Sequence, residues 1–96
     1  MPAVTRKGDA DVTHCSTPFR LGCSEDVFVN NIGVSRQGDV NTVHVLPGLP
    51  CPSHQQVITT GSTTVFVNNL GCGRIGDGIT ACTSVAQGSP DVFAGG

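Results

Sequence analysis

The sequence predicts an all-β fold made of short hairpins that repeat three times along one domain, residues 1–96. Three observations support this prediction. No window carries apolar residues at helical spacing, and 13 Gly and 6 Pro interrupt every stretch. Two short motifs also recur, and one of them joins alternating apolar residues to an Asn-Asn pair that is typical of a tight turn. We therefore expect almost no helix.

The first motif predicts a β-hairpin. It occurs at residues 27–33 (VFVNNIG) and returns 38 positions later at residues 65–71 (VFVNNLG), and a related segment at residues 88–96 closes the sequence. Alternating apolar residues are typical of a strand with one buried face. Asn shares with Gly a tolerance for positive φ, so an Asn-Asn pair can fill both central positions of a two-residue hairpin turn.

The second motif is Arg-x-Gly-Asp, which occurs at residues 6–9, 36–39 and 74–77. We interpret it as a turn in which the Asp carboxylate accepts nearby backbone N–H groups and the Arg pairs with a carboxylate or carbonyl. A catalytic role for the three Asp residues is the less favoured alternative, because the chain has no nucleophile elbow, phosphate-binding Gly loop or His-Glu-x-x-His motif. Three copies of each motif, ordered as if circularly permuted, predict pseudo-threefold internal repeats.

The composition argues against several classes of function. Charged residues are 12% of the chain and the net charge is −2, so there is no basic footprint for nucleic acid. The only aromatic residues are 4 Phe, which is a poor basis for stacking bases. The first residues lack the apolar run of a signal peptide, so we expect the chain to be made in the cytoplasm. Disulfides are rare there, and an odd count of 5 Cys also argues against a disulfide framework.

A metal site is predicted from residues at equivalent positions of the repeats. Five residues after the Asp of each Arg-x-Gly-Asp motif stand His14, His44 and Cys82. Equivalent residues converge on a pseudo-threefold axis, and His54, in an insert that interrupts the repeats, supplies a fourth ligand. Three His and one Cys suit Zn²⁺ better than iron, and four protein ligands close the site, which makes it structural.

Other assignments of the cysteines stay open. Cys51 lies three residues before His54 and could replace His44 as a ligand. Cys15, Cys23 and Cys72 are interpreted as small buried hydrophobes, with a Cys15–Cys51 or Cys23–Cys72 disulfide as a lesser alternative. The apolar core looks thin, and small domains with thin cores usually need a metal, disulfides or a partner. We therefore expect the metal-free chain to unfold or aggregate.

The sequence resembles the PAAR-repeat family over essentially its whole length. The resemblance rests on the opening residues 1–9 (MPAVTRKGD), on the Val-Phe-Val-Asn units and on the Gly-Asp-x₄-His/Cys spacing, while the later copies at 33–36 and 71–74 are degenerate. It implies a short pointed cone of β-hairpins with a zinc ion near the apex. The ligands of the family fall on His14, His44, His54 and Cys82.

The resemblance also implies a function, that of a structural tip without enzymatic activity. Such a tip caps and sharpens the C-terminal blunt end of a trimeric β-helical spike, one copy per trimer, in a contractile phage tail or a type VI secretion system. It is carried out of the cell, pierces the target envelope and touches the target membrane only transiently. The sequence stops at Gly96, so we expect a bare tip without a toxic domain.

Two other functions remain as alternatives: a small metal-dependent hydrolase and a metal-binding surface protein. A hydrolase would need an acid or base beside the metal, and no Asp or Glu adjoins His14, His44 or His54 in the sequence. The choice between a phage tail and a secretion system stays open.

Overall fold

The computed structural model describes residues 1–13, 16–45, 53–80 and 82–96. This part of the chain is all β, without helix, as the sequence predicts. Its named strands have two residues each and form four two-stranded antiparallel sheets. They are β1 (Phe28–Val29), β2 (Ile32–Gly33), β3 (His44–Val45), β4 (Ser53–His54), β5 (Phe66–Val67), β6 (Leu70–Gly71), β7 (Gly78–Ile79) and β8 (Thr83–Ser84). No helix long and apolar enough to cross a membrane is present in these ranges.

The two Val-Phe-Val-Asn-Asn segments form the hairpins that the sequence predicts. Phe28 pairs with Gly33 across β1–β2, and Phe66 pairs with Gly71 across β5–β6. All four turn residues have positive φ, between 53° and 65°, namely Asn30, Asn31, Asn68 and Asn69. Two consecutive left-handed residues match the twist of the flanking strands, which explains why Asn occupies both positions.

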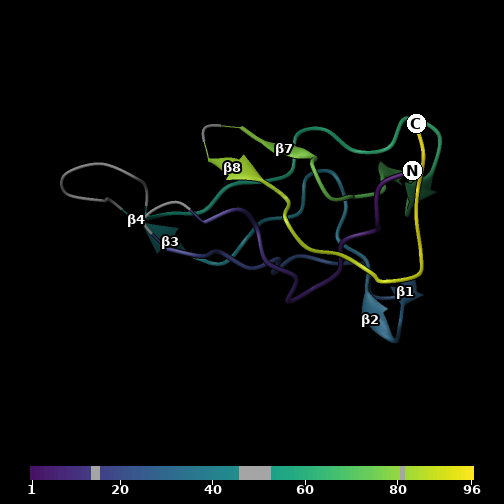
Figure 1. The fold of residues 1–96 in the computed structure, drawn as a ribbon, viewed down its shortest axis with the longest axis horizontal. Coiled ribbons are helices and arrows are strands. Elements are labelled where there is room, and N and C mark those ends of the chain that lie inside the picture. The colour runs from purple at the N-terminus through teal and green to yellow at the C-terminus, as the bar shows by residue number, and fades with distance from the viewer. Residues whose placement is uncertain (14–15, 46–52, 81) are drawn as a thin grey trace.

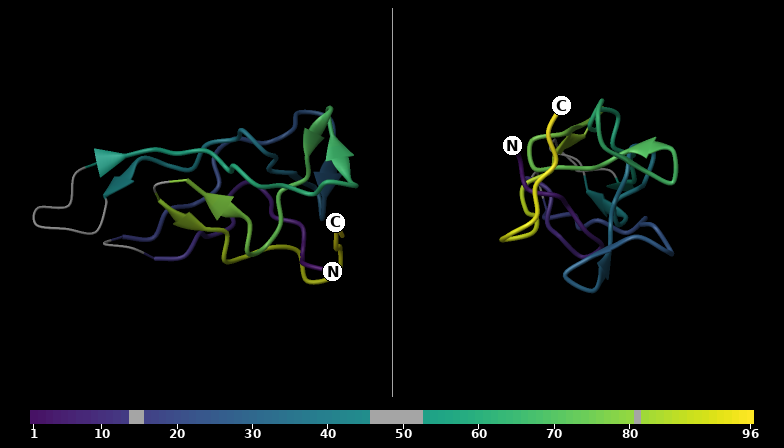
Figure 2. Two further views of the ribbon diagram at one scale, coloured as in Figure 1. Left: turned by 90° about the horizontal axis from the view of Figure 1, so that it is seen from above. Right: turned by 90° about the vertical axis from the view of Figure 1, so that its right-hand side faces the viewer.

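A third pairing of the same kind joins the two ends of the chain. Ala3 pairs with Phe93 in an antiparallel bridge, and the N–H of Ala94 donates to the carbonyl of Pro2 at 3.0 Å. Phe93 thus takes the place that Phe28 and Phe66 hold in the hairpins. Both termini accordingly lie together at the end of the molecule that carries β1–β2 (Figures 1 and 2).

Three backbone hydrogen bonds close a ring in the interior. The N–H of Thr5 donates to the carbonyl of Gly73 at 3.0 Å, that of Gly73 to Ser35 at 2.9 Å, and that of Ser35 to Thr5 at 3.1 Å. Each of these residues directly precedes the Arg of an Arg-x-Gly-Asp motif. A Cβ at Gly73 would come within 2.6 Å of the Ser35 carbonyl oxygen, so this position requires Gly. The ring joins the three Arg-x-Gly-Asp motifs through backbone groups alone.

The apolar core is thin and is divided between two clusters. One contains Val4, Val34, Val67, Cys72 and Ala94, and the other contains Ile58, Ile79 and Val85 with Cys82 packed against them. The molecule is elongated, with extents of 39 × 23 × 21 Å. β3–β4 lies at the end opposite to β1–β2 and the termini (Figure 1).

Candidate metal centre

The backbone brings two of the predicted metal ligands face to face. In the β3–β4 pair His44 lies directly opposite His54, and Val45 opposite Ser53. Directly opposed residues of an antiparallel pair have Cα atoms about 4.5–5.5 Å apart. Two of the four positions proposed for zinc are therefore neighbours, although they are ten positions apart in the sequence. His14 and the alternative ligand Cys51 lie outside the described residues, as does Cys15.

Cys82 is the predicted ligand whose side chain the structure describes. It stands between β7 and β8, half-buried against Ile58, Ile79 and Val85. Its Sγ accepts a hydrogen bond from Nδ2 of Asn41 at 3.6 Å. Burial is the main cause that raises the pKa of the Cys82 thiol, and the hydrogen bond from Asn41 offsets part of the rise. A metal that binds here must displace the thiol proton, so binding would release a proton.

The segment that leads to His14 runs beside β8. The N–H of Val12 donates to the carbonyl of Ser84 at 2.8 Å, and the hydroxyl of Thr83 donates to the carbonyl of Val12 at 3.1 Å. These bonds hold the backbone two residues before His14 next to the residues that follow Cys82. Among the side chains that the structure describes, no three His, Cys, Asp or Glu groups come together. Of the four predicted ligands, Cys82 is the one whose side chain is among those described.

A buried polar cluster underlies this region and consists of Asp11, Arg20 and Asn41. Each has at most 2% of its surface exposed. Nη2 of Arg20 forms an ion pair with Oδ2 of Asp11 at 3.0 Å, and Nδ2 of Asn41 donates to the same oxygen at 3.2 Å. Because Asn41 also contacts Cys82, the buried polar cluster extends to the thiol. A Cys thiolate that accepts a hydrogen bond from a buried polar group suits Zn²⁺ chemically, as do His residues as ligand types.

The three Arg-x-Gly-Asp motifs are turns, as the sequence predicts. Each Arg forms an ion pair with the Asp of its own motif, with N–O distances of 2.9, 2.8 and 2.9 Å. One oxygen of each carboxylate also accepts the backbone N–H of that Arg at 2.7–2.8 Å. The Gly before each Asp, at positions 8, 38 and 76, has φ near 90°. The carboxylates of Asp9, Asp39 and Asp77 therefore hold turns together, which supports the structural interpretation over the catalytic one.

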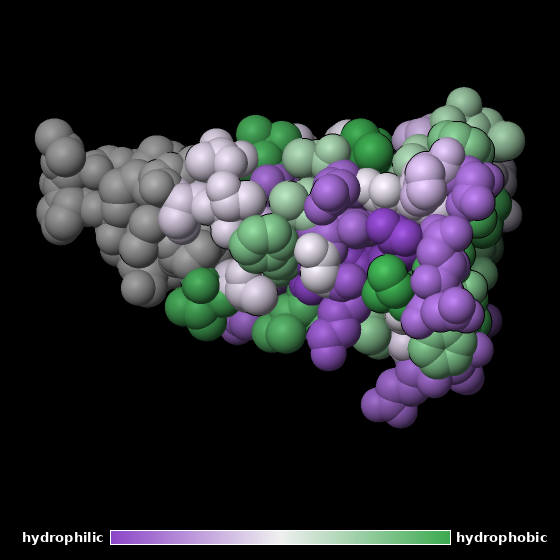
Figure 3. Space-filling model, turned by 60° about the horizontal axis from the view of Figure 1, so that its bottom comes forward, coloured by the Kyte–Doolittle hydropathy of each residue, from purple (hydrophilic) through white to green (hydrophobic). Residues whose placement is uncertain are grey.

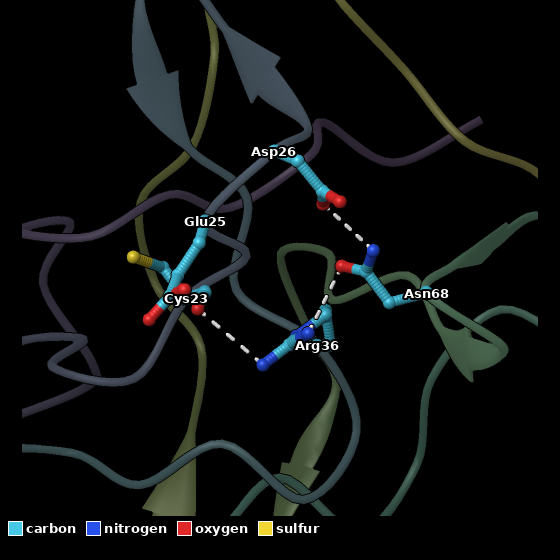
Figure 4. A pocket seen from close by; sticks show the side chains of 5 residues that line it. All are labelled: Cys23, Glu25, Asp26, Arg36 and Asn68. Carbon is cyan, nitrogen blue, oxygen red and sulfur yellow. Dashed lines mark hydrogen bonds between the residues drawn. The ribbon is translucent and has the colours of Figure 1, made fainter.

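A shallow pocket lined by Cys23, Glu25, Asp26, Arg36 and Asn68 lies at another place on the surface (Figure 4). Nη1 of Arg36 donates to Oδ1 of Asn68 at 3.0 Å, and Nδ2 of Asn68 donates to Asp26 at 2.7 Å. The bond from Asn68 is the main cause that lowers the pKa of Asp26. Arg36, Asn68 and Asp26 thus form a chain of hydrogen bonds that links the residues before β1 to the β5–β6 turn.

The same link recurs between other repeats. Arg6 donates to Asn30 at 3.0 Å, and Asn30 donates to Asp91 at 2.9 Å. In the same way, Arg36 donates to Asn68, and Asn68 donates to Asp26.

The structure also tests one of the alternative disulfides. Cys23, which lines the pocket, and the buried Cys72 are both free thiols, so the alternative Cys23–Cys72 disulfide is not formed. Cys72 belongs to the apolar core, as its interpretation as a small hydrophobe predicts.

Sequence reasoning missed two groups of structural residues. One is the set of serines whose Oγ accepts the N–H of the Val three positions later, at Ser24, Ser62 and Ser89. Their signal was a Ser three positions before each Val-Phe pair. The other is the buried polar cluster. Its signal was weaker, because Asp11 and Asn41 stand two residues after the Asp of their motifs, where the third repeat has the apolar Ile79.

Neither a protein-family model nor a curated protein matches this chain.

Proposed function

We propose that this chain is the tip of a contractile injection spike, as its resemblance to the PAAR-repeat family implies. It would cap the C-terminal blunt end of a trimeric β-helical spike, in a phage tail or a type VI secretion system, and would catalyse nothing. The ring formed by Thr5, Ser35 and Gly73 carries this proposal. A monomer with three equivalent segments around one ring offers a true threefold partner three similar edges.

The end of the molecule with the termini supplies a suitable docking surface. Phe28, Phe66 and Phe93 occupy equivalent positions there and remain 57%, 59% and 49% exposed. The preceding residues, Val27, Val65 and Val92, are also exposed. On the face drawn in Figure 3, apolar residues lie in separate groups among polar ones. Three equivalent pairs of exposed Val and Phe would let a threefold partner make the same apolar contact three times.

The opposite end would be the apex of a pointed cone. It carries β3–β4, at the far end of a molecule whose extents are 39 × 23 × 21 Å, and neither of the two apolar clusters contains a residue of that strand pair. We infer that His14, His44, His54 and Cys82 hold a zinc ion there. Structural zinc in small domains contributes an apparent free energy of about 10–16 kcal/mol, which rivals the stability of a whole domain. Such a site would stiffen the point that meets the target envelope.

The contacts of the described carboxylates favour this role over a hydrolase. Asp11, the carboxylate of the buried polar cluster, binds Arg20 and Asn41. Asp9, Asp39 and Asp77 bind the Arg residues of their own turns. A metal-binding surface protein, the other alternative, would have no use for three equivalent apolar groups at the far end.

The test is binding to the trimeric β-helical spike protein that the same genome encodes. Native mass spectrometry of the mixture should give one chain per trimer. Phe66→Ser should weaken binding about 10-fold or more, because exposed aromatic anchors dominate such interfaces. Val43→Ser is the matched control, since Val43 is 67% exposed, lies one residue before β3 and should not touch the spike. Three chains per trimer, no complex, or equal losses for the two variants would contradict the proposal.

A further inference from the structure

Asn41 is the residue through which the buried polar cluster reaches the predicted metal centre. Its side chain is fully buried, and each of its polar atoms has a partner. Nδ2 donates to Asp11 at 3.2 Å and to Cys82 at 3.6 Å, and Oδ1 accepts the N–H of Gln56 at 3.0 Å. A primary amide can make these three contacts at once, because it carries two donor hydrogens and an acceptor on one planar group.

The backbone around Asn41 contains a β-bulge. Val40 pairs with Val57, whereas His44 pairs with His54. His44 is four residues after Val40, but His54 is only three residues before Val57, so the first segment has one extra residue. A bulge adds one unmatched residue to a strand and re-aims the side chains beyond it. The pairing of His44 with His54 therefore depends on what holds this bulge in place.

Asn41 holds the bulge with two bonds to a single residue. Its backbone N–H donates to the carbonyl of Gln56 at 3.0 Å, and its side-chain oxygen accepts the N–H of the same residue. On the segment that leads into β3, the acceptor for the N–H of Gln56 is therefore the side-chain oxygen of Asn41. Gln56 lies two residues after His54, and Asn41 lies three residues before His44.

We propose that Asn41 is a positioning residue for the zinc centre, holding the Cys82 sulfur with an N–H···S bond while fixing the register that brings His44 to His54. This inference rests on the proposed function, because it assumes that these residues bind a metal. Its physical basis is that a hydrogen bond to a metal-bound thiolate orients the sulfur and draws electron density from it. Asp11 would act one step further out by accepting the hydrogen bond from Asn41, and Arg20 would hold Asp11 in turn.

The first test uses Co²⁺ in place of zinc, because Co²⁺ bound to a thiolate has a sulfur-to-metal charge-transfer band. In Asn41→Leu, which removes the donor and the acceptor, and in Asn41→Asp, which keeps only the acceptor, the band should move to longer wavelength. Competition with a chelator should show zinc binding about 10-fold to 100-fold weaker in both variants. Asn68→Ala is the matched control, since Asn68 also donates and accepts hydrogen bonds but belongs to the link between repeats.

The outcomes separate this inference from the proposed function. A charge-transfer band in the wild type that stays in place in both Asn41 variants would overturn the role of Asn41 and leave the metal site intact. No thiolate band in the wild type would overturn the metal site itself. Should neither variant fold, NMR of the ¹¹³Cd-loaded wild type decides the matter. Scalar coupling between ¹¹³Cd and an Hδ2 of Asn41 is expected across the N–H···S bond, and its absence with Cd bound to Cys82 would contradict the proposal.

Discussion

At the scale of single residues, the least expected feature is a fully buried ion pair in so small a protein. Arg20 and Asp11 meet at 3.0 Å with no exposed side-chain surface. Arg20 also donates from Nη1 to the carbonyl of Asp39 at 3.2 Å, so it connects the first two repeats. Burying such a pair costs desolvation energy that its mutual attraction only partly offsets, but removing one partner leaves an uncompensated buried charge.

Replacing Arg20 with Met should therefore be strongly destabilising. Met has similar bulk but cannot neutralise Asp11 or donate to Asp39, so we expect the free energy of unfolding to fall by about 3–5 kcal/mol. Urea unfolding of the metal-loaded protein measures this loss. Lys7→Met is the control, because Lys7 is exposed and its replacement should change stability by less than about 0.5 kcal/mol. A loss below about 1 kcal/mol for Arg20→Met would mean that the pair contributes no more than a surface contact.

At the scale of elements, what is local in the sequence proved predictable. The Asn-Asn hairpins and the Arg-x-Gly-Asp turns are encoded by seven and four consecutive residues respectively, and both form as predicted. The β3–β4 pair was not predicted as an element, because its pairing joins two segments across the insert and depends on a bulge. Nothing within either segment specifies that register, which long-range contacts through Asn41 and Gln56 set instead.

The hairpin turns offer a direct test of the local argument. Asn69 has φ of 65° and is exposed, so a replacement there changes backbone strain with little loss of packing. Asn69→Val should cost about 1–2 kcal/mol, because a β-branched residue is strained in the left-handed region. Asn69→Gly should stay within a few tenths of a kcal/mol of the wild type, since Gly adopts this conformation freely. Thermal unfolding of the two variants side by side checks the difference, and equal stabilities would contradict the assignment of the turn.

At the scale of the whole molecule, backbone hydrogen bonds join the repeated motifs, whereas buried polar side chains lie near the predicted metal centre. The ring of Thr5, Ser35 and Gly73 joins the three Arg-x-Gly-Asp motifs, and the pairing of Ala3 with Phe93 joins the two ends of the chain. The sequence indicated the repeats, but not that buried polar groups would lie beneath the predicted metal centre. That part could not be foreseen, because Asp11 and Asn41 are polar where the third repeat is apolar, and burial is invisible in the sequence alone.

The central claim is that a metal held by His14, His44, His54 and Cys82 stabilises the narrow end of a structural tip. Elemental mass spectrometry of the purified chain, beside Cys82→Ser and the control Cys23→Ser, tests it most directly. We expect about one zinc per chain in the wild type and in Cys23→Ser. In Cys82→Ser we expect the metal to be lost together with the cooperative unfolding transition. A stably folded wild-type chain that contains no metal would contradict this account.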